Sequence, residues 1–180
     1  RLFFALWPTP ELQRQMAVIG AEQARRAGGR PVREENLHIT LAFLGNVTEE
    51  QLDCLREGLQ TLSGQGFTLM LDRLGGFRRS GVTWLGSTEV PEALTALVSE
   101  LGRLMQECGF EPDTRPYQPH VTLRRRSRRS PGHPSFTPLR WPVAEFVLVE
   151  SHISSEGAHY EVLERRALMP SPGPEPGEQG

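Results

Sequence analysis

The triplet His-x-Thr occurs twice in this chain, 82 positions apart and in closely matching surroundings. The two copies are Leu37-His38-Ile39-Thr40-Leu41 and Pro119-His120-Val121-Thr122-Leu123. Because successive side chains of a strand point to opposite faces, each copy places an imidazole and a hydroxyl on one face and branched apolar side chains on the other. Two such strands, side by side with their apolar faces in a core, would line a cleft with four polar groups.

Two histidines in one cleft provide the groups for paired proton transfer. The ordinary pKa of an imidazole is about 6.5, so near neutral pH one ring can be neutral while the other is protonated. A reaction that removes one proton and delivers another needs this combination of base and acid. Either histidine alone would be interpreted as a partly buried side chain, whereas the matched pair favours catalysis. Neither has a second ligand at zinc-site spacing, so we expect no metal.

The length and the composition fit a single globular domain. The chain has 180 residues and a formal charge of −2, and we place the domain at residues 1–169. The proline- and glycine-rich residues 170–180 are predicted to be disordered. No apolar run reaches the length of a membrane span, so no membrane association is expected. Cys54 and Cys108 lie in separate amphipathic segments and are interpreted as buried free thiols in a reducing, cytoplasmic compartment. We expect a monomer.

All 20 basic residues are arginine, and lysine is absent. A phosphate-binding loop that ends in GK[ST], a lysyl-nucleotide intermediate and a lysine Schiff base are therefore excluded. Arginine suits bidentate recognition of phosphate. Five arginines closely follow the second triplet, at positions 124, 125, 126, 128 and 129. This concentration favours a local anion site despite the acidic total charge.

Hydrophobic periodicity and turn residues predict alternating strands and helices. A strand, a helix and a motif strand follow one another at 2–7, 11–27 and 38–44, and the same order recurs at 82–85, 91–108 and 120–123. This repetition indicates two related lobes, each with one triplet, that face each other across a cleft. Another helix is predicted at 48–62, where Thr48 and Gln51 form a capping box. The remaining predicted strands are 67–74, 144–151 and 160–168, with a loop from 124 to 138.

Several segments complete a family pattern around the two triplets. They run from Asn36 to Gly45 and from Arg115 to Leu123, with further similarity at 1–6, 29–32, 84–86 and 160–163. With these segments the chain resembles the 2H phosphoesterase superfamily, and within it the bacterial and archaeal RNA 2′,3′-cyclic phosphodiesterases once described as 2′-5′ RNA ligases. The resemblance implies an α+β, bilobal fold: two pseudo-symmetric lobes of mainly antiparallel sheet, with outer helices, around a central cleft. It also implies hydrolysis of a terminal 2′,3′-cyclic phosphate to a 2′-phosphomonoester, with no metal or other cofactor.

The resemblance also assigns roles to individual residues. His38 corresponds to the general acid that protonates the departing 3′-oxygen, and His120 corresponds to the general base that activates water. Thr40 and Thr122 would bind the phosphate, and the family's second motif, HxTxxR, places its arginine at Arg125. In-line attack at phosphorus needs proton transfers on opposite sides, which two histidines from opposed strands satisfy.

Strand alternation disagrees with this family motif at one position. Continued from His120, alternation places Arg124 and not Arg125 on the face of the histidine. Arg125 therefore reaches the cleft only if the strand bends or ends near Leu123.

Four further residues are candidates for contacts with a base or an RNA strand. Arg124 and Arg126 either follow an RNA backbone or belong to a solvated basic loop. Tyr117 and Phe43 are candidates for stacking on an unpaired base, with packing in a loop or in the core as the alternative.

Three functions are compatible with these residues. The leading hypothesis is metal-independent hydrolysis of 2′,3′-cyclic phosphates, with RNA ends or cyclic nucleotides as partners. The same groups can run in reverse and join a 5′-hydroxyl to a cyclic phosphate in a 2′-5′ linkage without ATP, although the excess of water favours hydrolysis. The third is a non-catalytic module that binds RNA ends, against which the intact His and Thr of both copies argue.

Overall fold

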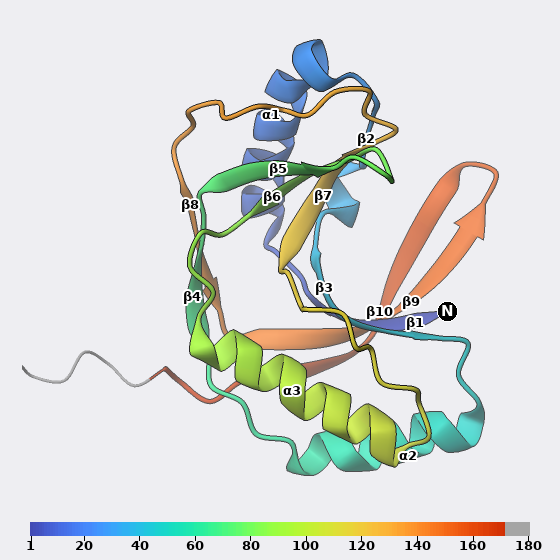
Figure 1. The fold of residues 1–180 in the computed structure, drawn as a ribbon. Coiled ribbons are helices and arrows are strands. Elements are labelled where there is room, and N and C mark those ends of the chain that lie inside the picture. Colours follow the sequence, from blue (N-terminus) through green and yellow to red (C-terminus); the bar gives the residue numbers. More distant parts are fainter. Residues whose placement is uncertain (172–180) are drawn as a thin grey trace, which may run out of the picture.

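The computed structural model describes residues 1–171, so most of the predicted disordered tail, residues 172–180, lies outside the described residues. Strands and helices alternate along the chain (Figure 1). The elements are β1 (Leu2–Leu6), α1 (Pro10–Ala27), β2 (Arg30–Pro31), the 3-10 helix η1 (Glu34–Asn36), β3 (Ile39–Gly45), α2 (Glu49–Thr61), β4 (Phe67–Leu71), β5 (Arg73–Phe77), β6 (Val82–Gly86), α3 (Glu92–Glu107), β7 (His120–Arg125), β8 (Leu139–Val143), β9 (Glu145–Ser154) and β10 (Gly157–Ala167).

One antiparallel sheet carries both triplets. Its strand order is β10-β9-β1-β3-β7-β6-β5, with β2 paired to β7 at one side. The strands β3 and β7 meet only at Ile39 and Val121, so the sheet divides there into two half-sheets. These two residues are the middle positions of the His-x-Thr triplets. The pseudo-symmetric contact therefore brings the two motifs side by side, and it confirms the predicted α+β, bilobal architecture.

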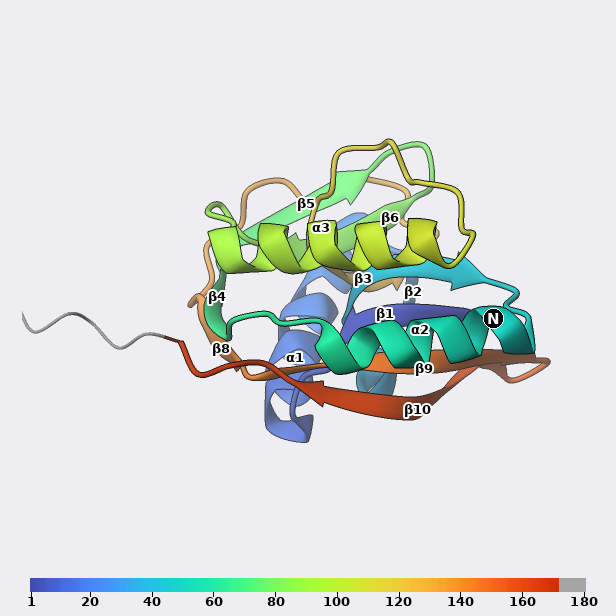
Figure 2. The same ribbon diagram turned by 90° about the horizontal axis from the view of Figure 1, so that it is seen from below.

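The helices α1 and α3 each pack against a strand of the other repeat. The helix α1 follows β1 in the chain but packs against β7, where Gly20 lies close to Leu123. In the other direction, α3 follows β6 but packs against β3. Figures 1 and 2 show α1 at the half-sheet of β5, β6 and β7, while α2 and α3 lie together beneath the half-sheet of β1, β3, β9 and β10. The expectation that each repeat forms its own lobe is therefore wrong for the helices, since each lobe takes its helix from the other repeat.

Two sequence predictions for strands need correction. The predicted strand 67–74 is two strands, because the chain leaves β4 at Asp72 and enters the large sheet as β5. Asp72 fixes this change of direction by donating its backbone N–H to Gly86 and accepting the backbone N–H of Thr88 on its side chain. The strand β8 lies between the predicted loop and the predicted strand 144–151, in residues for which the sequence analysis predicts no element. It pairs with β4 in a two-stranded sheet, in which each strand is an edge that tolerates proline, here Pro142.

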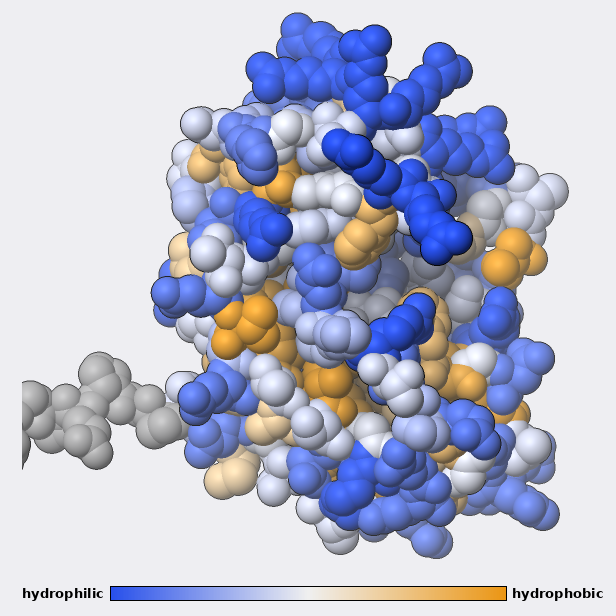
Figure 3. All heavy atoms as spheres, in the orientation of Figure 1, coloured by the Kyte–Doolittle hydropathy of each residue, from blue (hydrophilic) through white to orange (hydrophobic). Residues whose placement is uncertain are grey.

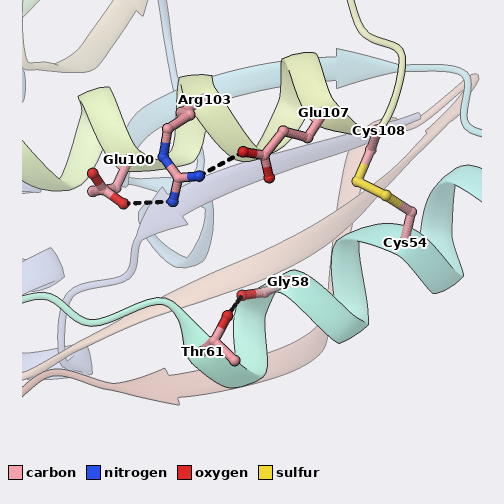
Figure 4. A network of polar contacts seen from close by, with 7 residues as sticks. All are labelled: Cys54, Gly58, Thr61, Glu100, Arg103, Glu107 and Cys108. Carbon is pink, nitrogen blue, oxygen red and sulfur yellow. Dashed lines mark hydrogen bonds and ion pairs between the residues drawn. A yellow bond between two sulfur atoms is a disulfide. The ribbon is translucent and has the colours of Figure 1, made fainter.

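The two cysteines form a disulfide, which contradicts the expected free thiols. Cys54 in α2 and Cys108 at the end of α3 are joined with a Cα–Cα distance of 5.7 Å (Figure 4). The same part of α3 carries Arg103 between Glu100 and Glu107, with which it forms ion pairs. The two cysteines belong to separate helices, and only the packing of α2 beside α3 brings them together. With both cysteines in a disulfide, the cysteines no longer indicate a reducing compartment.

The core lies between the large sheet and the helices, and a smaller apolar cluster lies on the opposite, cleft-facing side. The strand β1 contributes to both, because Phe4 and Leu6 join the main core while Phe3 and Ala5 join the smaller cluster. No helix of residues 1–171 is long and apolar enough to cross a membrane. The imidazole of His38 packs against this smaller cluster through Phe3.

Candidate active site

A cleft of about 970 Å³ opens between the two half-sheets, and both triplets line it. His38 and Thr40 enter it from the first motif, and His120 and Thr122 enter it from the second. Arg125 lines the same cleft. Figure 3 shows a recess in this face of the molecule, with hydrophilic side chains gathered around it. The five residues that the sequence assigned to catalysis and phosphate binding are thus brought to one cavity.

The orientation of His38 is fixed by two hydrogen bonds and by stacking. Its Nδ1 lies 2.6 Å from the carbonyl oxygen of Asn36, which can only accept, so Nδ1 carries the hydrogen. Its Nε2 lies 3.1 Å from Oγ1 of Thr40. The ring of Trp7 stacks on the imidazole with centroids 4.9 Å apart and an interplanar angle of 5°. In the neutral ring, Nε2 therefore has the free lone pair and accepts the hydroxyl hydrogen of Thr40.

The surroundings of His38 disfavour its protonated form. Burial lowers its pKa from 6.5 to about 4, and the positive charge of Arg125 and the neighbouring His120 act in the same direction. The carbonyl of Asn36 opposes this shift, because it stabilises the ring N–H. The neutral form of His38 is consequently favoured at neutral pH.

His120 repeats the arrangement of the first histidine. Its Nδ1 lies 2.8 Å from the carbonyl oxygen of Gln118, two residues before it, as Asn36 stands two residues before His38. The ring edge of Phe77 contacts it at 5.1 Å between centroids. Within residues 1–171 its Nε2 makes no hydrogen bond. Both histidines therefore have Nδ1 tied to their own backbone and Nε2 available for proton transfer.

The conflict between Arg124 and Arg125 is resolved by an irregularity in β7. Opposite β6, Trp84 pairs with Thr122 while Thr83 pairs with Arg124, so Leu123 is an extra residue in the ladder. Arg124 is consequently buried, and its guanidinium donates to the carbonyl oxygens of Gly28 and Gly29 instead of entering the cleft. Arg125 reaches the cleft, as the family motif implies, because the extra residue bends the strand before it.

Two of the four candidate RNA contacts lie at the cleft and two do not. Phe43 is 72% exposed and lines the cleft, and so does Arg126. Tyr117 instead donates its hydroxyl to the backbone oxygen of Thr40, and burial raises the pKa of this phenol. Tyr117 and Arg124 are thus structural, because partners elsewhere in the fold use the polar groups that were expected to meet RNA.

Sequence analysis missed the aromatic residues that surround the first histidine. Besides Trp7, the rings of Phe3 and Tyr160 contact His38 at 5.1 and 5.3 Å between centroids. Phe3 and Trp7 alternate along β1 and the residue after it, and Tyr160 comes from β10. Alternation could have placed Phe3 and Trp7 on one face, but nothing in the sequence indicates that β1 lies beside β3.

One group of possible metal ligands exists within the described residues, and it lies away from the motif histidines. It consists of Glu150, His152 and Glu161 on the paired strands β9 and β10. Its residues alternate with Ser151 and Ile153, which line the cleft, so the group is on the other face of these strands.

The fold matches that of a solved phosphoesterase structure, with a TM-score of 0.83 at 34% identity. Residues 8–156 match the sequence model of the 2′-5′ RNA ligase superfamily, and the chain therefore belongs to this superfamily. It is 36% identical to an Escherichia coli RNA 2′,3′-cyclic phosphodiesterase, with 93% of this chain and 96% of the relative covered. A Thermus thermophilus protein of the same name is 33% identical, with 99% and 98% covered. The crystal structure of E. coli LigT complexed with 3′-AMP superposes with a TM-score of 0.84 at 35% identity, covering 93% of this chain and 97% of that one.

Proposed function

We propose that this protein hydrolyses 2′,3′-cyclic phosphates at RNA ends or on nucleotides to 2′-phosphomonoesters, by paired histidine acid–base catalysis without a metal. The observation that carries the proposal is the repeated geometry of His38 and His120. Each ring has Nδ1 fixed by a backbone carbonyl and offers Nε2 to one shared cleft. Relatives at 29–36% identity are named RNA 2′,3′-cyclic phosphodiesterases, which supports the same substrate class.

In the proposed mechanism, Nε2 of His120 removes a proton from water as the oxygen attacks phosphorus. Nε2 of His38 delivers a proton to the departing 3′-oxygen on the opposite side, and the 2′-phosphomonoester remains. Arg125 and the two threonine hydroxyls hold the non-bridging oxygens, where negative charge increases in the transition state. Acid and base exchange roles in the reverse direction, so the same site would form 2′-5′ linkages from a 5′-hydroxyl and a cyclic phosphate. The name of the superfamily favours this as a second activity.

Substrate binding would favour the protonated form of His38, which its surroundings in the free protein disfavour. A phosphate anion beside Arg125 offsets the positive charge that helps to lower the pKa of His38. Its non-bridging oxygens would also accept the hydroxyl hydrogen that Thr40 now donates to Nε2. Nε2 would then be free to take up a proton and to donate it to the leaving oxygen.

The first test is turnover of the four nucleoside 2′,3′-cyclic monophosphates, and of a short RNA with a cyclic end, in excess EDTA. We expect the 2′-monophosphate as product, a bell-shaped pH profile, and loss of turnover in His38→Asn and His120→Asn. His133→Asn is the matched control, because His133 is exposed and does not line the cleft. Normal turnover in both motif variants would refute the catalytic assignment. Tight RNA binding without turnover in the wild-type protein would favour a non-catalytic module.

A second experiment separates the acid from the base. When the 3′ bridging oxygen is replaced by sulfur, the leaving group is a thiolate that needs little protonation. His38→Asn should then recover most of its lost rate, whereas His120→Asn should not. Recovery in His120→Asn alone would reverse the two assignments.

We also propose that the protein is a monomer, which light scattering measures directly.

A further inference from the structure

Arg126 has an unusual backbone conformation directly after the second motif strand. Among residues 1–171 it is the only residue other than glycine with a positive φ, at +57°. This left-handed region is unfavourable for a residue with a Cβ atom, whereas glycine enters it freely. Backbone strain of this kind is concentrated at functional sites, where the surrounding structure maintains it. The conformation therefore raises the question of what the side chain of Arg126 does.

Two glycines hold the backbone of Arg126 in place. A Cβ atom at Gly29 would lie 2.5 Å from the carbonyl oxygen of Arg125 and 3.1 Å from the carbonyl carbon of Arg126. A Cβ atom at Gly81 would lie 3.3 Å from Cα of Arg126. Ser127 adds a hydrogen bond of 2.7 Å from its N–H to the carbonyl oxygen of Gly81. The backbone of Arg126 thus packs closely against both glycines, and this packing and the hydrogen bond of Ser127 hold it in the left-handed conformation.

In this conformation the side chain of Arg126 lines the cleft beside Arg125. Arg30 lines the same wall, because β2 pairs with β7 so that Arg30 stands opposite Arg125. Within residues 1–171, none of these three guanidinium groups forms an ion pair. Arg115 also lines the cleft, but Asp113 compensates its charge at 2.8 Å. The wall formed by β2 and β7 therefore carries three uncompensated positive charges.

The opposite wall of the cleft has a different character. Phe3, Phe43 and Tyr160 line it, from β1, β3 and β10. Aromatic rings suit a nucleobase, and guanidinium groups suit phosphates. In the proposed function, Arg125 and the side chains of the two triplets bind one cyclic phosphate. On the wall formed by β2 and β7, the positive charges of Arg30 and Arg126 then remain for a second anionic group of the same substrate.

We propose that Arg126 and Arg30 form a second phosphate-binding subsite, which takes the phosphate attached to the 5′-oxygen of the terminal nucleotide. The inference rests on the proposed hydrolysis of cyclic phosphates and specifies its substrate class. That phosphate is either the internal phosphodiester of an RNA strand or the free 5′-phosphate of a mononucleotide. Both present the same oxyanion to the arginines, and a nucleoside cyclic phosphate with a 5′-hydroxyl lacks it.

The test compares kcat/KM for three substrates with the same base. They are a nucleoside 2′,3′-cyclic phosphate, its 5′-phosphorylated form and a dinucleotide with a cyclic end. Charge-assisted hydrogen bonds to one phosphate should give the wild-type protein a preference of roughly tenfold or more for a substrate with the 5′-side phosphate. The preference should fall towards one in Arg126→Gly and in Arg30→Ala. For the preferred substrate, the dependence of log kcat/KM on log salt concentration should become shallower by about 0.7 per lost contact.

Arg126→Gly separates the subsite from the integrity of the fold. Glycine accepts the left-handed conformation, so the variant should melt at or above the temperature of the wild type while losing the preference. Arg128→Ala is the control, because Arg128 is exposed, lies outside the cleft and makes the same change in charge. An equal preference for both phosphate-bearing substrates would assign recognition to the phosphate alone. A preference for the dinucleotide only would assign the internal phosphodiester.

The outcomes that overturn the subsite differ from those that overturn the proposed function. If the wild-type protein hydrolyses all three substrates equally well, or if Arg126→Gly keeps the full preference, the subsite is refuted while the hydrolytic function stands. If the wild-type protein hydrolyses none of them, the function fails. The subsite is then judged by calorimetric affinity for the same compounds, where an equal affinity with and without the 5′-side phosphate refutes it.

Discussion

Replacing Arg124 by methionine should destabilise the fold, whereas the same replacement at Arg125 should leave stability nearly unchanged and weaken substrate binding. Arg124 is 6% exposed, and its guanidinium donates to the carbonyl oxygens of Gly28 at 2.7 Å and Gly29 at 2.5 Å. These bonds attach the end of α1 and the start of β2 to β7. Arg125 is exposed and lines the cleft. Arg124 thus stabilises the fold, whereas Arg125 is available to bind substrate.

The two hydrogen bonds set the size of the effect. A hydrogen bond with a charged donor contributes roughly 1.5–3 kcal/mol to the free energy of unfolding. Methionine keeps much of the packing of the arginine stem. Both glycines are half-buried, so water can hydrogen-bond their carbonyl oxygens in place of the guanidinium and offset part of the lost stability. We therefore expect a loss near the lower limit of two such bonds, about 3 kcal/mol. For a chain of this size, that corresponds to a decrease in Tm of roughly 6–12 °C.

Urea unfolding and calorimetry of both variants test this reasoning. Arg124→Met should show a lower midpoint with an unchanged m value, since the native surface area is conserved. Arg125→Met should unfold like the wild type and show a higher KM for cyclic phosphates. If Arg124→Met is as stable as the wild type, or if Arg125→Met is the destabilised variant, the assignment of the two arginines is wrong.

Three further predictions concern the disulfide, the first histidine and one glycine. The double variant Cys54→Ala/Cys108→Ala lacks a cross-link that spans 54 positions, and its free energy of unfolding should be lower by about 4 kcal/mol. A thiol titration of the unreduced wild type should find no free thiol. Below pH 6.5 the unfolded chain protonates His38 while the folded chain does not until about pH 4, so stability should decrease across this interval in urea titrations, and less so in His38→Asn. Gly29→Ala introduces a Cβ atom 2.5 Å from a backbone oxygen at φ +82° and should lower both stability and kcat/KM, whereas Gly28→Ala meets no atom within 4 Å and should show only the cost of its φ of +64°.

Local sequence signals determined the three α-helices and the chemical groups that line the cleft. Alternation within each triplet placed the imidazole and the hydroxyl on one face, and the structure has both pairs in the cleft. The capping box of Thr48 and Gln51 is present with both of its hydrogen bonds at the start of α2. The three predicted helices agree with the structure to within one or two residues. These features depend on residues a few positions apart, and so the sequence alone was sufficient.

Other features of the site depend on which distant segments meet. The pairing of Ile39 with Val121 sets the two motifs side by side, and the extra residue Leu123 in β7 turns Arg125 into the cleft. The disulfide between α2 and α3 has the same origin, as has the stacking of Trp7 on His38. The sequence determined which groups were available and which face of a strand or helix carried them. Only the tertiary structure decided their partners, because non-local pairing follows from the packing of whole surfaces and not from the pattern of any single segment.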